Sequence, residues 1–472
     1  VEYCELPSDR ELVPDIHPSK LKIRVEDTDY ASFYDKSINI RQQNGYILKG
    51  KGTETFECRF AYMGFQFVRV TADPGVTVER VEAVPVHTDV AEAGRFVCSN
   101  DVVNRLQDMS RASLLNNFHS IPTDCPHREK QGWTADTYMT DQAAIYNFDM
   151  AAFYAKWVED LAGTQDSAGG LCTVAPSTGY DQSISTVWPA AIVYVPWDLL
   201  AYYGDRRVVE RHYETMMRFA ESSLLRQRDG KPEIIGEVLG DWVSPHMTLS
   251  DTLMSYSMAP PEGLTLYGTA SHYRVVRNLA EVARFLGKRD DAVRLDAWAD
   301  RIARRFNEEF FDAASGIYHG ENPTPYRQAA NVVPLEYGLV PEADSARVLG
   351  SLLRDLDGTR DRIGTGFVGT LSMMELMPRI DPERAYRLAT QPDYPGWGFM
   401  ALSGATTMWE TWDGSASRNH PPFCLISAYF YKYLAGIRCD RAYPGFERFT
   451  VDPSVVGDLT FVEAWHDSPY GR

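Results

Sequence analysis

The chain has 472 residues, with 47 Lys and Arg against 65 Asp and Glu, and a net charge of −18. This length allows two or three domains and a large hydrophobic core. The acidic balance argues against nucleic acid or an anionic membrane surface as a partner, because both require a basic face. No apolar run in the sequence approaches the length of a membrane span.

The first 95 residues have the pattern of β-structure. Large apolar side chains alternate with charged or small ones from Phe56 to Tyr62, which is typical of a half-buried strand. Gly64 interrupts this run before a second candidate strand over 65–70. A third, Val76–Val86, follows the turn-like sequence Asp-Pro-Gly. We predict an antiparallel β-sandwich domain over 1–95, or part of one.

Helical periodicity dominates from Ser99, a candidate N-cap, to about residue 437. A helix predicted over 190–203 would end at Gly204, with Asp205 capping the next. A second pair of helices is predicted around Gly287, the first running from Tyr273 to Leu286. The recurrence of helix, glycine stop, helix and long loop predicts a ring of helix pairs over 96–437. The long loops would gather at one end, where functional residues tend to lie.

Short alternating stretches follow from Phe449 to Val451 and from Leu459 to Val462. They predict the start of a second β domain over 438–472, which stops before it is complete. The N-terminal V-E-Y-C-E-L-P has neither an initiator Met nor a signal-peptide pattern. We therefore expect a fragment or a processed chain.

The seven cysteines are dispersed and form no C-x-x-C pair, so they predict neither a disulfide framework nor a zinc cluster. They are Cys4, Cys58, Cys98, Cys125, Cys172, Cys424 and Cys439. We expect free thiols in a reducing compartment, which favours the cytoplasm, and no metal.

The densest group of charged residues lies between Thr123 and Asp141, which reads T-D-C-P-H-R-E-K-Q-G-W-T-A-D-T-Y-M-T-D. Pro126 disfavours a helical conformation for the residue before it, so the first carboxylate of this stretch is expected on a loop. Carboxylates, a guanidinium and an indole on a stiff loop would form a sugar-binding wall that contains an acid. The alternative is a helix start stabilised by salt bridges.

A second group spans Tyr394 to His420, where Glu410 lies between two tryptophans. Such a carboxylate stays ionised only if hydrogen bonds or charges compensate its burial. The alternative is a structural glutamate satisfied by neighbouring threonines. Gly240-Asp241-Trp242 repeats the pairing of carboxylate and indole, with simple packing as its alternative. The loop-like stretch from Gly169 to Trp188 would line the same mouth or serve only as a connection.

Two glutamates in aromatic loops suggest glycoside hydrolysis, which needs one protonated and one ionised carboxyl group on either side of the scissile bond. Repulsion from Asp124 and Asp136, together with desolvation by Trp133, would favour the protonated form of Glu129. Arg128 would oppose this effect.

The motifs D-C-P-H-R-E-K-Q-G-W-T-A-D, then G-D-W, then G-A-T-T-x-W-E-x-W with S-x-N-H give the chain a strong similarity to glycoside hydrolase family 78. The chain resembles the bacterial-type α-L-rhamnosidases of this family from Phe56 to Arg472, including F-A-Y-M-G-F at 60–65. The resemblance implies a mainly α fold: a six-fold (α/α) barrel over 96–437, flanked by β-sandwiches. It also implies an inverting mechanism without a cofactor.

The resemblance further implies roles for individual residues. Glu129 matches the general acid and Glu410 the general base. Asp124, Arg128 and Asp136 match residues around the rhamnose hydroxyls. The other matches to the pocket for the terminal sugar are Trp133, Asp241, Trp242, Trp397, Trp412 and His420.

The resulting hypothesis is an exo-acting inverting α-L-rhamnosidase that releases terminal rhamnose from a glycoside or oligosaccharide. L-Rhamnose carries a methyl group at C5, so its pocket needs an apolar wall opposite hydroxyl binders.

The alternatives are a trehalase-like hydrolase or a polysaccharide lyase on an (α/α) barrel, and a non-catalytic carbohydrate-binding protein on the same scaffold. A lyase would need a Tyr or His base and a cation, and the acidic balance argues against it. The aglycone and the oligomeric state stay open, with a homodimer among the alternatives.

Overall fold

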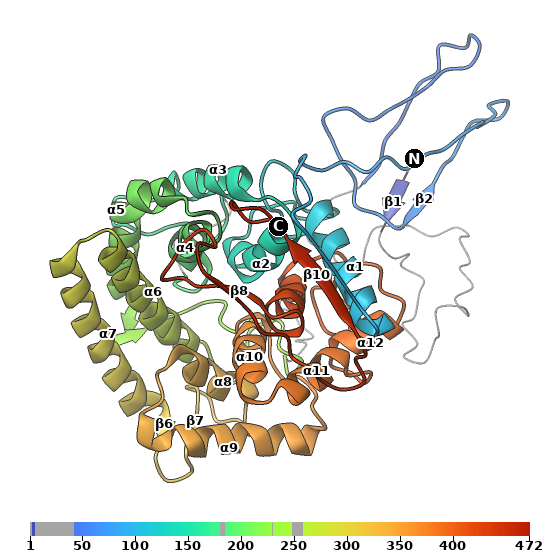
Figure 1. Ribbon diagram of the computed structural model, residues 1–472. Coiled ribbons are helices and arrows are strands. Elements are labelled where there is room, and N and C mark those ends of the chain that lie inside the picture. The colour runs from blue at the N-terminus through green and yellow to red at the C-terminus, as the bar shows by residue number, and fades with distance from the viewer. Residues whose placement is uncertain (1, 5–41, 180–184, 229, 248–257) are drawn as a thin grey trace.

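The computed structural model describes residues 2–4, 42–179, 185–228, 230–247 and 258–472 (Figure 1). The fold is mainly helical, and the strands are short and paired two by two. No helix in the described ranges combines the length and the apolar character needed to cross a lipid bilayer.

The α-helices are, in chain order, α1 (Asp101–Asn116), α2 (Thr134–Asn147), α3 (Ala151–Ala162), α4 (Ala191–Tyr203), α5 (Arg206–Ser222), α6 (Thr265–Phe285), α7 (Arg289–Phe310), α8 (Gln328–Tyr337), α9 (Glu342–Thr359), α10 (Phe367–Ile380), α11 (Pro382–Thr390), α12 (Trp397–Leu402) and α13 (Leu425–Tyr429). The strands are β1 (Glu2–Cys4), β2 (Phe67–Arg69), β3 (Gly94–Cys98), β4 (Gln227–Arg228), β5 (Lys231–Ile235), β6 (Phe311–Asp312), β7 (Ile317–Tyr318), β8 (Ile437–Cys439), β9 (Phe449–Val451) and β10 (Val462–His466).

Six helices form a closed ring: α2, α4, α6, α8, α10 and α13 each contact the next, and α13 packs against α2. The helices between them lie outside this ring. In this outer layer α3 and α5 pack on α4, α7 on α6, α9 on α8, and α11 on α10. Figure 1 shows α7 and α9 at the periphery of the helical body.

The sequences of the helices explain these two layers. In α4 all residues but Tyr203 are buried, and the helix is apolar on every side, as expected of a helix enclosed by others. In α7 the buried residues recur with helical spacing on one face (Leu295, Trp298 and Ile302 among them), as expected of a surface helix. Helix α2 is exceptional because it is buried and yet carries two carboxylates, Asp136 and Asp141.

Several predicted helix ends are confirmed. Gly204 ends α4 in the left-handed conformation, at φ 70°, where glycine avoids the steric cost of a Cβ. Asp205 caps α5 by accepting the backbone N–H of Arg207.

Two predicted helix starts are wrong. The N-cap of α1 is Asn100, whose side chain accepts two backbone N–H groups, whereas Ser99 bonds to the backbone just before β10 through Thr460 and Phe461. Helix α6 begins at Thr265, well before Tyr273. Its first turn is stabilised by the distant side chain of Glu321, which local sequence does not reveal.

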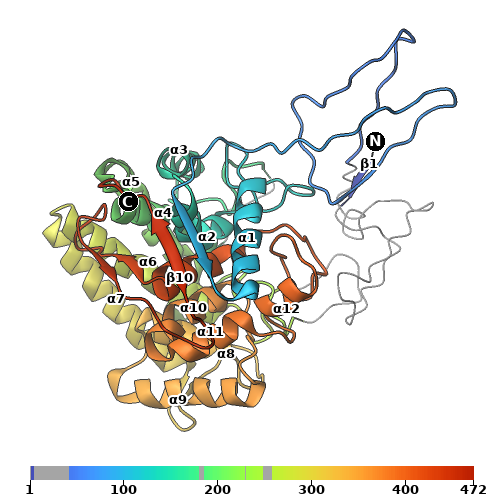
Figure 2. The same cartoon turned by 45° about the vertical axis from the view of Figure 1, so that its right-hand side comes forward.

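The strands predicted in the N-terminal region are largely absent from its described residues. Of the three candidates, only Phe67–Arg69 is a strand, and it pairs with β1. The stretches from Phe56 to Tyr62 and from Val76 to Val86 are not strands, and Phe60 is fully exposed. Alternation of apolar and polar residues produces a strand only where a neighbouring strand pairs with it and a hydrophobic core buries its apolar face. In both views the described part of the N-terminal region projects from the helical body (Figures 1 and 2).

The C-terminal residues return to the start of the helical region. Strand β8 pairs with β9, so the predicted strand over Phe449–Val451 is confirmed. Strand β10 begins at Val462, where the second predicted stretch ends, and pairs antiparallel with β3, directly before α1 (Figure 2). The boundary predicted at 95 therefore falls inside a strand that belongs to this pair.

Candidate active site

The loop from Asp124 to Trp133 carries the first group of candidate residues into α2. It is closed by a reciprocal pair of hydrogen bonds between Asp124 and Gln131: the backbone N–H of each donates to the other, to a carboxylate oxygen in one case and to a carbonyl in the other. Helix α2 then starts directly after Trp133, so the loop and Asp136 are fixed relative to each other.

A segment of the N-terminal region braces this loop. The Lys130 ammonium donates to the backbone carbonyl of Tyr62 (2.6 Å) and lies over its ring at 4.4 Å from the centroid. A Cβ on Gly64 would come within 2.7 Å of the backbone of Pro126 and His127. The F-A-Y-M-G-F sequence thus lies directly behind the residues that precede Glu129.

The two candidate glutamates meet at one guanidinium. Nη2 of Arg128 lies 2.9 Å from Oε1 of Glu129 and 3.0 Å from Oε2 of Glu410. The two carboxylate oxygens cannot be farther apart than these distances laid end to end. The sequence predicts this meeting of residues from distant parts of the chain, but not the arginine between them.

This separation is shorter than the roughly 6.5–9.5 Å between carboxyl groups that is typical of inverting glycosidases. It refers, however, to the two oxygens that share Arg128 and not to the carboxyl centres. The second oxygen of Glu129 accepts the indole N–H of Trp133 at 2.7 Å. The stereochemical outcome therefore stays a prediction.

The two glutamates differ in their exposure. The side chain of Glu129 is 26% exposed and that of Glu410 only 6%. Burial alone would raise the pKa of Glu410, but the charges of Arg128 and His420 and the backbone N–H of Ser417 lower it below its ordinary value. Glu410 is therefore ionised at neutral pH, as a general base must be.

His420 connects Glu410 to α2. Its Nε2 lies 3.0 Å from Asp136 and its Nδ1 lies 4.0 Å from Glu410. Although burial opposes protonation, Glu410, Asp136 and Asp124 together raise the pKa of His420 to about 9. Burial and the charge of Glu129 raise the pKa of the fully buried Asp124 to about 8. At neutral pH both His420 and Asp124 thus hold a proton.

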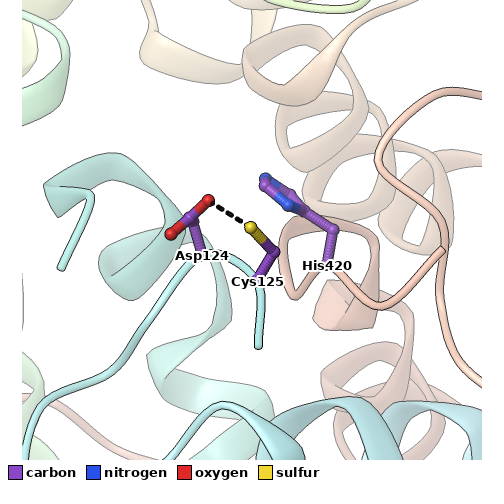
Figure 3. A group of neighbouring side chains, drawn as sticks. All are labelled: Asp124, Cys125 and His420. Carbon is purple, nitrogen blue, oxygen red and sulfur yellow. Dashed lines mark hydrogen bonds between the residues drawn. The ribbon is translucent and has the colours of Figure 1, made fainter. Parts of the chain in front are cut away.

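Asp124, Cys125 and His420 each offer one potential metal ligand, and these atoms lie within 4.8 Å of one another (Figure 3). The thiol of Cys125 donates to Oδ2 of Asp124 at 2.9 Å, and burial raises the pKa of the thiol well above its ordinary value. A metal would require a thiolate and a neutral imidazole. These three side chains are therefore described more simply as a protonated, hydrogen-bonded group.

The four candidate tryptophans fall into two classes. Trp133 and Trp242 are half-buried, so each keeps some surface in contact with solvent. Trp397 and Trp412 are fully buried, lie edge to face with centroids 5.2 Å apart, and donate to backbone carbonyls. Their burial and hydrogen bonds fix these two rings in place, and their part in the sugar pocket stays a prediction.

Asp241, predicted as a pocket residue, makes hydrogen bonds to the protein backbone, and its contact with substrate stays a prediction. It is fully buried, and its two carboxylate oxygens accept the backbone N–H groups of Gly366 (2.7 Å) and Gly369 (2.8 Å) at the start of α10. The side chain thus stabilises the N-terminus of α10. The neighbouring Phe367 stacks on His420 with ring centroids 6.2 Å apart.

The described part of the Gly169–Trp188 stretch supports the site from behind. The backbone carbonyl of Thr173 accepts from the N–H and the hydroxyl of Thr134, at the start of α2. The N–H of Ala175 donates to Gly132, where a Cβ would lie 2.1 Å from the Ala175 carbonyl. Residues 180–184 lie outside the described residues.

The sequence does not single out three residues that the structure adds to the site. Cys125 contacts Asp124, Ser417 donates its N–H to Glu410, and Phe367 covers His420. Cys125 and Ser417 lie inside the motifs described above, and this position in a motif is the only feature of the sequence that could have pointed to them. Phe367 lies in an ordinary apolar helix, which contains no such signal.

Family models match three consecutive parts of the chain. They are the bacterial alpha-L-rhamnosidase concanavalin-like domain over residues 19–87, the 6 hairpin glycosidase domain over 91–434, and the C-terminal domain over 436–472. The first match includes residues that lie outside the described ranges.

Among curated proteins, the chain is 30% identical to an alpha-L-rhamnosidase of Formosa agariphila, with 90% of this chain and 46% of that protein covered. It is also 30% identical to one of Streptomyces avermitilis, with 90% and 40% covered. The chain thus spans about half the length of the curated relatives it matches.

Solved structures give a similar result. An α-L-rhamnosidase of Dictyoglumus thermophilum superposes with a TM-score of 0.75 at 33% identity, covering 84% of this chain and 44% of that one. The Streptomyces avermitilis enzyme, solved in complex with L-rhamnose, superposes with a TM-score of 0.77 at 28% identity, covering 90% and 40%. With most of its residues matched by the glycosidase domain, the chain belongs to the bacterial α-L-rhamnosidase family of glycoside hydrolases.

Proposed function

We propose that this chain forms the catalytic part of an exo-acting, inverting α-L-rhamnosidase that hydrolyses terminal α-L-rhamnose from glycosides or oligosaccharides. The observation that carries the proposal is the convergence of Glu129 and Glu410 on Arg128, in one cluster with Asp136 and His420. A relative in the same family was solved with L-rhamnose, which supports this sugar as the ligand.

In this mechanism Glu410 takes a proton from a water molecule as the water attacks the anomeric carbon. Glu129 gives its proton to the glycosidic oxygen as the bond to the aglycone breaks. Arg128 can neutralise only one of the two carboxylates. The surroundings hold Glu410 ionised, which suits it to the role of base. The greater exposure of Glu129 suits the side of the site from which the aglycone departs.

The same proposal includes the finer architecture. The closed ring of α2, α4, α6, α8, α10 and α13, with its outer helices, is proposed to be the inner layer of a six-fold (α/α) barrel. We propose domains over 1–95, 96–437 and 438–472, with β-sandwiches on either side of the barrel. The family models divide the chain into three parts as well, with boundaries at 87–91 and 434–436, so that β3 belongs to the second part.

The site argues against two rival functions. A lyase would need an uncompensated cation for a uronate, whereas Arg128 already contacts two carboxylates. A binding protein without catalysis would have no need for a buried glutamate that is held ionised beside a second, exposed one.

The test is hydrolysis of phenyl α-L-rhamnoside by the wild type, Glu129→Gln and Glu410→Gln. Both variants should lose roughly two to four orders of magnitude in kcat/KM. Glu233→Gln is a matched control, because Glu233 also contacts an indole N–H (Trp298, 2.9 Å) and an arginine (Arg301) outside the site. Wild-type rates in either active-site variant would remove that residue from the mechanism.

NMR of the first-formed sugar should show β-L-rhamnose, and the α-anomer would exclude inversion.

A further inference from the structure

A cavity of about 990 Å³ lies within the ring of helices, separate from the glutamate pair. All six ring helices contribute to its wall, mostly through their central and C-terminal turns. Helix α2 shows the separation: Asp136, in its first turn, belongs to the active site, whereas Gln142 and Tyr146, farther along, line the cavity. Neither glutamate, and none of Asp124, Asp136 and His420, lines it.

The cavity opens to solvent on one side. On its wall, Arg277, Glu281 and Arg284 of α6 and Ala442 after β8 are exposed. The wall residues from α2 and α13 are buried except for Gln142, which is half-buried. A cavity with a buried floor and an exposed rim can admit a ligand from solution. Its volume is at the upper end of the roughly 300–1,000 Å³ that is usual for small-molecule sites.

Each cation on the wall already contacts a carboxylate. The pairs are Arg274 with Glu336, Arg277 with Asp296, Arg284 with Glu281, Lys432 with Glu375, Arg438 with Asp452, and Arg441 with Asp198. Asp141 lies beside Asp198, and burial together with that neighbour raises the pKa of Asp141 well above its ordinary value. The wall therefore has no uncompensated charge to select an ion.

The remaining chemistry of the wall is aromatic and rich in hydrogen-bonding groups. Eight tyrosines and Trp197 line the cavity together with these paired groups. Ion-paired carboxylates and guanidinium groups keep further acceptor and donor positions, which suit hydroxyl groups. Aromatic faces suit the apolar faces of a pyranose ring.

We propose that this cavity is a second carbohydrate-binding site, which takes a neutral mono- or disaccharide. The ligand is either the sugar released at the glutamate pair or an unrelated neutral sugar, and both present the same hydroxyl-rich chemistry. The proposal does not depend on hydrolysis at the other site.

The test measures sugar binding in a Glu410→Gln background by titration calorimetry. The probes are L-rhamnose, sucrose and D-glucuronate. We expect two binding events for L-rhamnose if the released sugar is the ligand, and one event for sucrose at the cavity if the site accepts neutral sugars broadly. Glucuronate should bind the cavity more weakly than either. Tighter binding of glucuronate would overturn the neutral class.

Two substitutions test whether the binding event takes place in the cavity. Ala428→Trp fills the buried part of the cavity, and Ala442→Trp obstructs its exposed rim, where a larger side chain does not threaten folding. Each should weaken the cavity event about tenfold or more, while hydrolysis of an aryl rhamnoside by the same substitutions in the wild-type background stays within about twofold. Ala313→Trp, on an exposed turn far from the wall, is the matched control. Unchanged binding in both cavity variants, or a single event for L-rhamnose with none for sucrose, would overturn the proposal.

Discussion

At the residue scale, a single guanidinium joins the two glutamates. Arg128 is 7% exposed and contacts both Glu129 and Glu410 through one nitrogen atom. Removing the charge from either carboxylate removes its repulsion of the other, while the attraction between Arg128 and the remaining carboxylate persists. The effect of a substitution at this site therefore reflects the group of three residues and not a single side chain.

The acid and base roles can be separated by the leaving group. Glu129→Gln should recover most of its activity on 2,4-dinitrophenyl α-L-rhamnoside, because that phenolate leaves without a proton, yet remain about 10²–10⁴-fold impaired on an alkyl rhamnoside. Glu410→Gln should be equally impaired on both substrates, since each needs an activated water. The measurement is kcat/KM for the two substrates. An impairment of Glu129→Gln that is independent of the leaving group would contradict its role as the acid.

The protein should lose stability as the pH rises from neutral to about 9. The pKa of His420 is raised from 6.5 to about 9, so its contribution is complete below pH 6.5 and is lost as pH rises through 9. Asp124, with its pKa raised from 3.8 to about 8, gives a change of the same sign between those two values. Thermal unfolding across this range should show a falling Tm.

His420→Gln should flatten this pH dependence between 6.5 and 9, because the titrating group is gone. One pKa unit corresponds to about 1.4 kcal/mol, so the effect is measurable by denaturant unfolding. The same slope in His420→Gln and wild type would show that other groups cause it.

The sequence made the two glutamates predictable because each lies in a dense motif of charged and aromatic residues. Arg128 was identified as a member of the site, yet its position between the carboxylates was not predictable. That position depends on how the loop before α2 meets the loop before α13, and these contacts join residues almost 300 positions apart. No local pattern encodes such a contact.

At the element scale, helix ends differ in how local their causes are. Gly204 and Asp205 act on their own helices, so the boundary between α4 and α5 could be predicted. The start of α6 depends on Glu321, which lies after α7, and could not. The start of α10 depends on Asp241 in the same way, and the sequence assigned that carboxylate to the substrate.

Asp241→Asn should therefore affect stability more than substrate binding. An amide keeps one acceptor but places a donor opposite a backbone N–H of α10, which should cost about 1–3 kcal/mol. The measurements are urea unfolding and the KM for an aryl rhamnoside, with KM expected within about twofold of the wild type. A large rise in KM at unchanged stability would instead return Asp241 to the substrate pocket.

At the scale of the whole molecule, distant segments meet at one glycine. A Cβ on Gly94 of β3 would lie 2.0 Å from the carbonyl oxygen of Tyr146 on α2 and 2.9 Å from that of Trp465 on β10. The sequence predicted a domain boundary here, because neither pairing leaves a local signal. The structure places β3, α2 and β10 in direct contact.

Gly94→Ala should lower Tm by several degrees, because backbone atoms on two sides must move to admit a methyl group. Gly45→Ala is the matched control, since a Cβ there meets nothing within 4 Å. Equal Tm values for the two variants would show that the backbone around Gly94 moves to admit the methyl group with little loss of stability.

Closure of the helical ring has a consequence for how the protein is made. The contact of α13 with α2 cannot form until residues up to Tyr429 have left the ribosome, and that of β10 with β3 not until residues up to His466 have done so. During translation the apolar sides of α2 and α4 therefore stay uncovered until their partner helices are synthesised, seconds to minutes later. We expect nascent chains that end before α13 to bind chaperones or to aggregate, and the two glutamates to be brought together only in the last steps of folding.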